Sequence, residues 1–137
     1  MRQDQRSTCP ISTALELIGD RWSLLVIRDL IFAGKRHFRE FLQSEEAISS
    51  NILADRLDSL VQSEILSKGI DPTHAQKVVY SLTQKGIDLL PVLAAMSAWS
   101  QKHYPSTCRP EAVQFVEGGA RALKQLGSQL RQKYEIT

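Results

Sequence analysis

Hydrophobic residues recur at helical spacing along most of the chain, and the clearest case is the stretch from Ile48 to Leu66. Leu53, Leu57 and Leu60 make one side of this stretch apolar, which predicts an amphipathic helix. The opposite side is polar and carries Asn51, Asp55, Asp58 and Gln62. Ser49 is placed to cap the helix, because its hydroxyl can accept a hydrogen bond from the first turn. The pattern is typical of an ordinary surface helix, and also of a helix whose polar first turn contacts a partner.

Two helices are predicted before this stretch. Pro10 begins the first, because a proline at a helix start lacks only an N–H that would be unpaired anyway, and Gly19 ends it. Asp20 caps a second helix from about Arg21 to Ala33. We expect this second helix to be a buried spine, because it is apolar over much of its circumference through Trp22, Leu25, Val26, Leu30 and Phe32.

A short helix from Phe38 to Leu42 is predicted next, with Phe38, Phe41 and Leu42 facing inward. The residues from Ser44 to Ala47 then form a turn before the helix at Ile48 to Leu66. Two helices joined by such a turn, the second with a polar first turn, satisfy the helix-turn-helix plan.

The pattern then changes to that of two short strands. Ile65 and Leu66 can begin one strand, Asp71-Pro72 is a strong turn signal, and Lys77 to Leu82 is rich in β-branched and aromatic residues. A hairpin directly after such a helix is typical of a winged helix. The alternative is a hairpin that only closes the core.

The C-terminal part is predicted to be helical. One long helix covers about Gln84 to His103, where Pro91 bends or breaks it, and a final helix covers Glu111 to Tyr134, weakened by Gly118-Gly119. Their apolar surface exceeds what a small domain can cover, which suggests a symmetric partner.

The fold class predicted for the whole chain is therefore mainly α with a small β-hairpin. It comprises a winged helix-turn-helix domain in residues 1–104 and a helical extension in 105–137 that packs at a dimer interface.

Composition narrows the class of protein. With 137 residues and a net charge of +2, the chain suits one domain, and any nucleic-acid site needs a local excess of positive charge. No apolar run is long enough to cross a bilayer, and the polar N-terminus lacks a signal-peptide pattern, so no membrane partner is expected. Cys9 and Cys108 form neither a disulfide framework nor a paired metal motif, which indicates a reducing, cytoplasmic compartment. The histidines are scattered, so we expect no catalysis, metal or cofactor.

Several motifs together carry a family resemblance. They are Cys9-Pro10, LELIGDRWSLLVIRDL from Leu15, HFREF from His37, ISSNILADRLDSL from Ile48 and YSLTQKGIDLLPVL from Tyr80. In this order and spacing, over about residues 9–100, the chain resembles the HxlR-type winged helix-turn-helix regulators. The resemblance implies a cytoplasmic bacterial or archaeal transcription factor, dimeric through its terminal helices, that binds near-palindromic operators. It also implies a recognition helix at Ser49 to Gln62 and a wing at about Lys68 to Val78. The chain departs from the family at Ser63-Glu64-Ile65-Leu66, where many relatives have a glycine.

Candidate contacts to double-stranded DNA follow from residue chemistry. Phosphate contacts position such a protein, and the candidates are Arg36, His37, Arg39, Arg56, Lys68, His74 and Lys77. Contacts to base edges specify the sequence; Ser49, Ser50 and Asn51 are the candidates, since Asn51 can pair bidentately with adenine. Asp55 either accepts from a cytosine amino group or discriminates against wrong sequences. The alternative for each cation is a solvated surface charge, and for Arg56 an intramolecular ion pair.

Cys9 has two interpretations. At a helix N-terminus the dipole favours a thiolate, and several HxlR-type regulators use a cysteine at the matching position to sense oxidants or electrophiles. The chain would then respond to an oxidant or another small-molecule inducer, with Cys108 as a weaker candidate for a resolving thiol across the dimer. The alternative is a buried small hydrophobic residue that packs the first helix against the dimer interface.

The rival function for the whole chain is a winged helix used only for protein contacts, without direct DNA binding.

Overall fold

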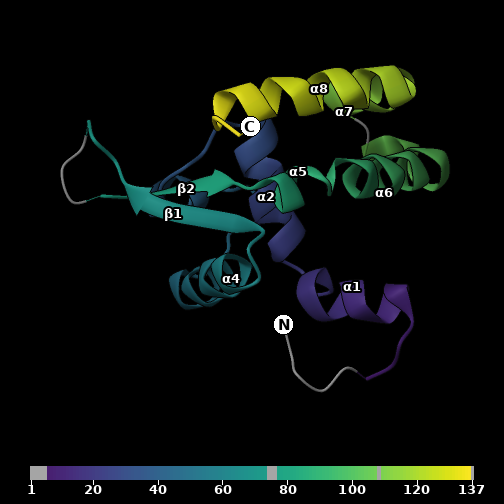
Figure 1. Cartoon of the computed structure of the whole chain (residues 1–137). Helices are drawn as coiled ribbons and strands as arrows, with labels where there is room; N and C mark the ends of the chain where they lie inside the picture. Colours follow the sequence, from purple (N-terminus) through teal and green to yellow (C-terminus); the bar gives the residue numbers. More distant parts are fainter. Residues whose placement is uncertain (1–5, 74–76, 108, 137) are drawn as a thin grey trace. The chain divides into compact units, whose positions relative to one another are not determined.

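The computed structural model describes residues 6–73, 77–107 and 109–136 (Figure 1). The chain forms two compact units, Met1–Thr83 and Gln84–Thr137, here called unit 1 and unit 2. Unit 1 contains α1 (Pro10–Ile18), α2 (Ser23–Phe32), α3 (Phe38–Phe41), α4 (Ser50–Gln62), β1 (Leu66–Ile70) and β2 (Val78–Leu82). Unit 2 contains α5 (Gln84–Ile87), α6 (Leu90–His103), the 3₁₀ turn η1 (Pro105–Thr107), α7 (Pro110–Glu117) and α8 (Gly119–Lys133). The domain boundary predicted after residue 104 stays a prediction.

Helix α1 begins and ends where the sequence predicts. Pro10 lies in its first turn, and Gly19 follows its last residue and donates its N–H to the carbonyl of Leu15 at 2.9 Å. No residue of α1 is buried, and Ile11 and Leu15 are 72% and 55% exposed. Two large apolar side chains of this helix are therefore uncovered.

Helix α2 supplies the centre of the unit 1 core. The carboxylate of Asp20 accepts the backbone N–H groups of Trp22 and Ser23, each at 2.9 Å, so it caps the helix start as expected. Ile27 and Leu30 are completely buried, as a spine requires. The prediction that Phe32 belongs to the buried surface is wrong, since it is 49% exposed. Phe32 lies roughly opposite Leu30 around the helix axis, because two residues correspond to a rotation of about 200°.

The helix-turn-helix consists of α3, a turn and α4. Leu53, Leu57 and Leu60 of α4 are buried to 1% exposure or less, which confirms the inward side predicted from their spacing. Phe41 of α3 is buried and its ring meets that of Tyr80 edge to face, with centroids 6.3 Å apart. The packing of α3 and α4 on this core leaves the polar side of α4 facing outward.

Strands β1 and β2 form the wing, an antiparallel hairpin whose register runs from Leu66↔Leu82 to Ile70↔Val78. Leu66, Tyr80 and Leu82 point to the same face and are buried, because residues two apart along a strand share a face. The hairpin base therefore closes the core while its far end extends from it, and the winged helix-turn-helix predicted from the sequence is confirmed.

The exit from α4 is a Schellman motif. After the cap residue Ser63, Glu64 has a positive φ of 62°. Its N–H donates to the carbonyl of Val61, and the N–H of Ile65 donates to that of Leu60, both at 3.0 Å. Glycine usually takes this left-handed position, because a Cβ is disfavoured there. At Ser63-Glu64-Ile65, the helix therefore ends in a geometry that glycine usually provides, with a glutamate in a strained backbone conformation.

Unit 2 differs from the two long helices predicted. The first is broken into α5 and α6, and Pro91 lies in the first turn of α6, where it removes no helical hydrogen bond. The single helix predicted from Glu111 to Tyr134 is wrong: the chain ends α7 and starts α8 at Gly118-Gly119. Gly119 has a φ of 61°, and a Cβ on Gly118 would lie 2.4 Å from that of Ala122. This turn therefore requires both glycines.

Helices α7 and α8 pack on the earlier helices of unit 2. Gly127 of α8 lies against Ile87 and Leu90, since a Cβ placed on this glycine would be 3.9 Å from each of their side chains. Ile87, Leu90 and Leu130 are buried and form the small core of this unit.

Candidate nucleic-acid interface

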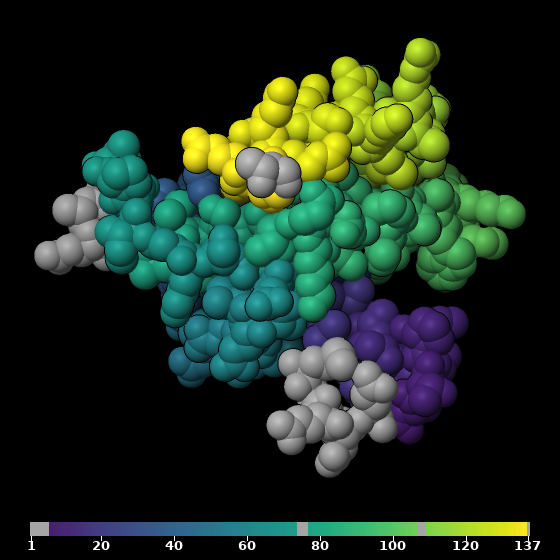
Figure 2. Space-filling model, viewed as in Figure 1, coloured from purple at the N-terminus to yellow at the C-terminus, as the bar shows by residue number. Residues whose placement is uncertain are grey.

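The first turn of α4 presents short polar side chains at the surface of unit 1. Ser49 caps the helix, with its hydroxyl oxygen accepting the N–H of Ile52 at 3.3 Å. Ser50 and Asn51 are exposed, and their side chains make no hydrogen bond within the described part of the chain. The teal surface in Figure 2 includes this helix. These side chains are available to hydrogen-bond a partner.

A polar cluster braces the turn that leads into α4. Arg28 on α2 donates to both carboxylate oxygens of Glu46, at 2.7 and 2.8 Å, and to Asp29 at 2.9 and 3.1 Å. Asp29 is only 5% exposed and also contacts Lys35, at 3.4 Å, and the hydroxyl of Ser44. The two-point bond to Arg28 lowers the pKa of Glu46 to about 2. This cluster joins α2 to the turn and so helps to set the direction of α4.

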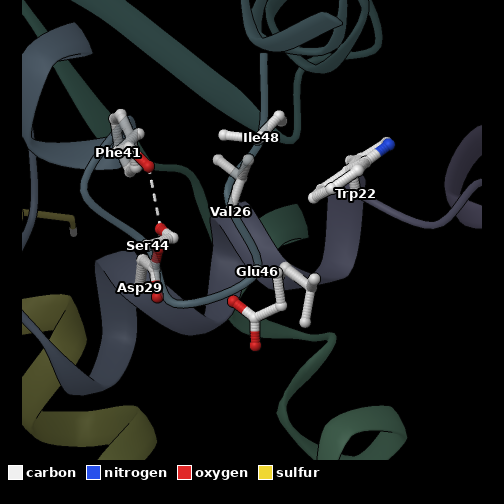
Figure 3. A pocket seen from close by; sticks show the side chains of 8 residues that line it. Trp22, Val26, Asp29, Phe41, Ser44, Glu46 and Ile48 are labelled. Atoms are coloured by element: carbon white, nitrogen blue, oxygen red, sulfur yellow. Dashed lines mark hydrogen bonds between the residues drawn. The ribbon is translucent and has the colours of Figure 1, made fainter.

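A small hollow lies beside this cluster (Figure 3). Asp29, Ser44 and Glu46 line it together with the apolar side chains of Val26 and Ile48. It has room for about one water molecule, at about 10 Å³. A drug-sized ligand needs several hundred Å³, so this hollow is not a preformed inducer pocket.

Two of the predicted phosphate contacts are engaged inside the protein. Arg36 donates from Nε to the carbonyl of Tyr80 at 3.1 Å and from Nη2 to the hydroxyl of Ser81, while its own carbonyl accepts the N–H of Tyr80. Arg56 pairs with its neighbour Asp55 and, at 3.5 Å, with Asp20. Arg36 therefore attaches the segment before α3 to β2, and Arg56 ties α4 to the start of α2.

His37 is also engaged, from the N-cap position of α3. Its Nδ1 lies 2.7 Å from Glu40 Oε1, and its Nε2 lies 2.8 Å from Asp71 Oδ2 in the wing. The hydrogen bond to Glu40, and then that to Asp71, raise the pKa of His37 above its usual value. The two carboxylates thus favour the imidazolium, which can donate from both ring nitrogens.

The remaining cations of the predicted site are Arg39, Lys68 and Lys77. All three are exposed, and no side-chain hydrogen bond or ion pair engages them within the residues that the structure describes. They lie in α3, in β1 and just before β2. His74 lies outside the described residues.

Cys9 is exposed at the N-cap position of α1 and is a free cysteine. It is not a packed core residue within this chain, although burial against a second copy is compatible with its position beside the exposed Ile11. Cys108, the candidate resolving thiol, lies outside the described residues.

Each unit has an exposed apolar surface. In unit 1 it comprises Ile11 and Leu15 of α1. In unit 2, Val92, Met96 and Trp99 of α6 are 37%, 52% and 59% exposed, and their spacing of four and three residues puts them on one side of the helix. Surfaces of this kind mark sites of protein contact more often than isolated exposed residues do.

Sequence reasoning missed the partners of the engaged side chains. Asp71 was interpreted only as part of a turn, and Glu46 had no role. A local signal existed for Glu40, because a polar N-cap residue three positions before a glutamate is the capping-box pattern, here His37 and Glu40. The Arg28–Glu46 and His37–Asp71 pairs join residues far apart in the sequence, and no local pattern indicates them.

No helix in the described ranges is long and apolar enough to span a membrane. Within the same ranges, no three side chains of His, Cys, Asp or Glu are grouped to hold a metal ion.

Comparison with known proteins matches residues 17–107 to the HxlR-like helix-turn-helix family. YodB of Bacillus subtilis, an HTH-type transcriptional regulator, is 37% identical over 95 residues, 69% of this chain and 84% of YodB. The structure of reduced YodB has a TM-score of 0.58 at 36% identity, covering 76% of this chain and 98% of that chain. The crystal structure of PA1607 has a TM-score of 0.67 at 34% identity, covering 77% and 70%. The redox regulator HypR in its reduced form has a TM-score of 0.60 at 28% identity, covering 69% and 92%.

Proposed function

Because this chain belongs to the HxlR-like helix-turn-helix family, whose curated relatives are named as transcriptional regulators, we propose that it binds operator DNA sequence-specifically as a homodimer. It acts in the cytoplasm, without a cofactor and without catalysis of its own. The observation that carries the proposal is the exposed polar first turn of α4, on a helix whose other side is fully buried.

In this proposal the first turn of α4 enters the major groove. Ser50 and Asn51 read base edges, and Asn51 can donate to N7 and accept from N6 of one adenine. Ser49 contributes its hydroxyl hydrogen, since its oxygen already accepts the N–H of Ile52. Asp55 forms an ion pair with Arg56, so the two charges offset each other. The pair therefore discriminates among sequences by shape and hydrogen bonding more than by net charge.

The phosphate contacts come from the three exposed cations, Arg39, Lys68 and Lys77. Arg36, His37 and Arg56 are weaker candidates for phosphate contacts, because each would have to leave its intramolecular partners to reach a phosphate. Arg39 positions the helix-turn-helix, and the two lysines position the wing.

The homodimer buries the exposed apolar side chains of α1 and α6 against a second copy. Ile11, Leu15, Met96 and Trp99 are large and more than half exposed, which is costly for a monomer in water. A twofold axis would repeat α4 and so explain a near-palindromic operator, with half-sites separated by about 10 bp or a multiple.

The proposed signal is a thiol-reactive oxidant or electrophile that reacts at Cys9. Relatives of known structure include quinone-bound YodB, diamide-treated YodB, and HypR in reduced and oxidised forms. Cys9 is exposed and free, as such a reaction requires. With a quinone, the sulfur would bond to a ring carbon, and the thiol proton would end on an oxygen of the resulting hydroquinone. Such an adduct at the N-cap of α1 lies next to the proposed dimer surface.

The test is selection of binding sites from a pool of random DNA duplexes by the full-length protein. We expect one enriched sequence with twofold symmetry, bound by two chains in sedimentation, with an affinity that falls steeply with salt. Enrichment of no sequence, or of a single half-site bound by one chain, would contradict the proposal.

A second candidate function is a winged helix that contacts only proteins. It is favoured by the charge of residues 1–83, which contain ten Lys and Arg against eleven Asp and Glu. A protein-contact module would show weak DNA affinity without sequence enrichment and little dependence on salt.

A further inference from the structure

His37 connects the helix-turn-helix to the wing. It is the N-cap residue of α3, and its two ring nitrogens lie 2.7 Å from Glu40 in that helix and 2.8 Å from Asp71 just after β1. Glu40 is held in turn, because its Oε1 accepts the backbone N–H groups of Arg36 and His37 at 3.1 and 2.9 Å. The imidazole ring is therefore fixed on the α3 side before it meets the wing.

Asp71 carries this connection into the turn of the wing. One oxygen, Oδ2, faces His37, while Oδ1 accepts the N–H and the hydroxyl of Thr73 at 2.9 and 2.7 Å. The N–H of Asp71 donates to the carbonyl of Lys77 at 2.9 Å and closes the hairpin. The buried Asp71 carboxylate thus links Thr73 and the end of β1 to the start of α3.

We propose that His37 is a positioning residue that holds Asp71, the residue after β1, against α3 and thereby places Lys68 and Lys77 of the wing for contact with DNA. The placement of the wing rests on contacts within unit 1 alone, whereas its effect on DNA rests on the proposed function. This role differs from the phosphate contact that the sequence suggested for His37, because both ring nitrogens are already occupied.

The role depends on the charge of His37. A neutral imidazole has one N–H and can donate to only one of the two carboxylates, whereas the imidazolium donates to both. Among the residues that the structure describes, the carboxylates that bond to the ring are Glu40 from α3 and Asp71 from the wing, and the guanidinium of the adjacent Arg36 is turned to β2. Deprotonation of His37 with rising pH therefore weakens the attachment of the wing.

Two substitutions separate the two contacts. In His37→Asn, the side-chain amide nitrogen replaces Nδ1 and keeps the contact to Glu40 but cannot reach Asp71. In His37→Gln, the amide nitrogen replaces Nε2 and can keep the contact to Asp71. Gln43→Ala is the matched control, because Gln43 is exposed just after the same short helix.

The first measurement is hydrogen-exchange protection of the Asp71 amide in the DNA-free protein, at about pH 6 and about pH 8.5, which lie below and above the ordinary histidine pKa of about 6.5. We expect protection in the wild type to fall with rising pH by about tenfold, the equivalent of one hydrogen bond. In His37→Asn, the protection of the Asp71 amide should be low at both pH values. In His37→Gln, the protection should be largely restored and independent of pH. Equal protection in the wild type and His37→Asn would overturn the proposal.

The second measurement is affinity for the duplex selected by the wild type. We expect His37→Asn to weaken DNA binding by about tenfold. Adding Lys77→Ala should weaken DNA binding more in the wild-type background than in the His37→Asn background, because in the latter Lys77 is no longer held in position to contact DNA. Unchanged affinity in His37→Asn would overturn the link to DNA. Failure of the wild type to select any sequence would instead contradict the proposed function and leave the exchange experiment as the test of wing placement.

Discussion

Arg28 and Glu46 form a two-point ion pair, at 2.7 and 2.8 Å, between α2 and the turn that precedes α4. The same arginine contacts the buried Asp29, so one guanidinium holds both ends of the cluster. Ala47, next to Glu46, has a positive φ of 60°, so the turn that carries Glu46 contains a backbone position that is unfavourable for a residue with a Cβ. The direction of the proposed DNA-reading helix thus depends on residues that would not touch DNA.

The first prediction concerns the acid stability of this pair. The pKa of Glu46 is depressed from 4.5 to about 2, so its stabilisation is present above pH 4.5 and is lost as the pH falls toward 2. Because Glu46 is about one-third exposed, we expect Glu46→Gln to lower the free energy of unfolding by only about 1 kcal/mol at pH 7. Urea denaturation at several pH values measures the difference, which should shrink in acid. A difference that stays constant down to the lowest measurable pH would contradict this assignment.

The second prediction concerns the exit from α4. Glu64→Gly should raise the free energy of unfolding by about 1 kcal/mol, because glycine adopts a φ of 62° without the steric cost that a Cβ carries. Thermal and urea denaturation measure it. Ala54→Gly, at an exposed position inside the same helix, is the control and should destabilise by about 1 kcal/mol. Destabilisation by both substitutions would show that the side chain of Glu64 outweighs the backbone strain.

The third prediction concerns base reading. Asn51→Ala should reduce discrimination among operator variants by about 1–3 kcal/mol, the value of one bidentate contact to a base. Binding of the selected duplex and of single-base variants measures it. Gln62→Ala, in the last turn of α4, should leave discrimination unchanged. Retention of full sequence preference by Asn51→Ala would remove Asn51 from the site.

The fourth prediction separates free cations from paired ones. Arg39→Ala should weaken binding to all DNA similarly and lower the slope of affinity against salt by about one, as expected for one lost phosphate contact. Arg56→Ala should leave that slope unchanged, because Arg56 is paired with Asp55 and Asp20. Fluorescence anisotropy over a salt series provides both slopes. A reduced slope for Arg56→Ala alone would reverse the assignment.

The fifth prediction concerns Cys9. A quinone or diamide should weaken operator binding by the wild type but not by Cys9→Ser, which keeps the size of the side chain and removes the reactive thiol. Cys108→Ser distinguishes two chemistries, because an adduct at Cys9 survives this substitution and a disulfide with Cys108 does not. Mass spectrometry under denaturing conditions reports the adduct or the cross-link. Equal responses of the wild type and Cys9→Ser would exclude Cys9 as the sensor.

Local patterns predicted the elements of unit 1 because each of them depends on near neighbours in the chain. The spacing of Leu53, Leu57 and Leu60 places all three on one side of α4, and the Ser49 cap requires only the next turn. The same reasoning failed at Gly118-Gly119, where weak helix formers were interpreted as part of one helix. The close approach of Gly118 to Ala122 and the positive φ of Gly119 make a turn there, which a count of propensities does not reveal.

The roles of the charged residues were decided by packing. Arg36, His37, Arg39 and Arg56 look equivalent in the sequence as cations near a helix-turn-helix, yet only Arg39 has no side-chain partner among the described residues. The others meet β2, the wing turn and the start of α2, up to 45 residues away along the chain. Hydrogen bonds of fixed length between distant segments form only after the backbone has brought them together. A linear pattern can therefore nominate a charge for DNA, but only the folded chain shows whether that charge is already bound within the protein.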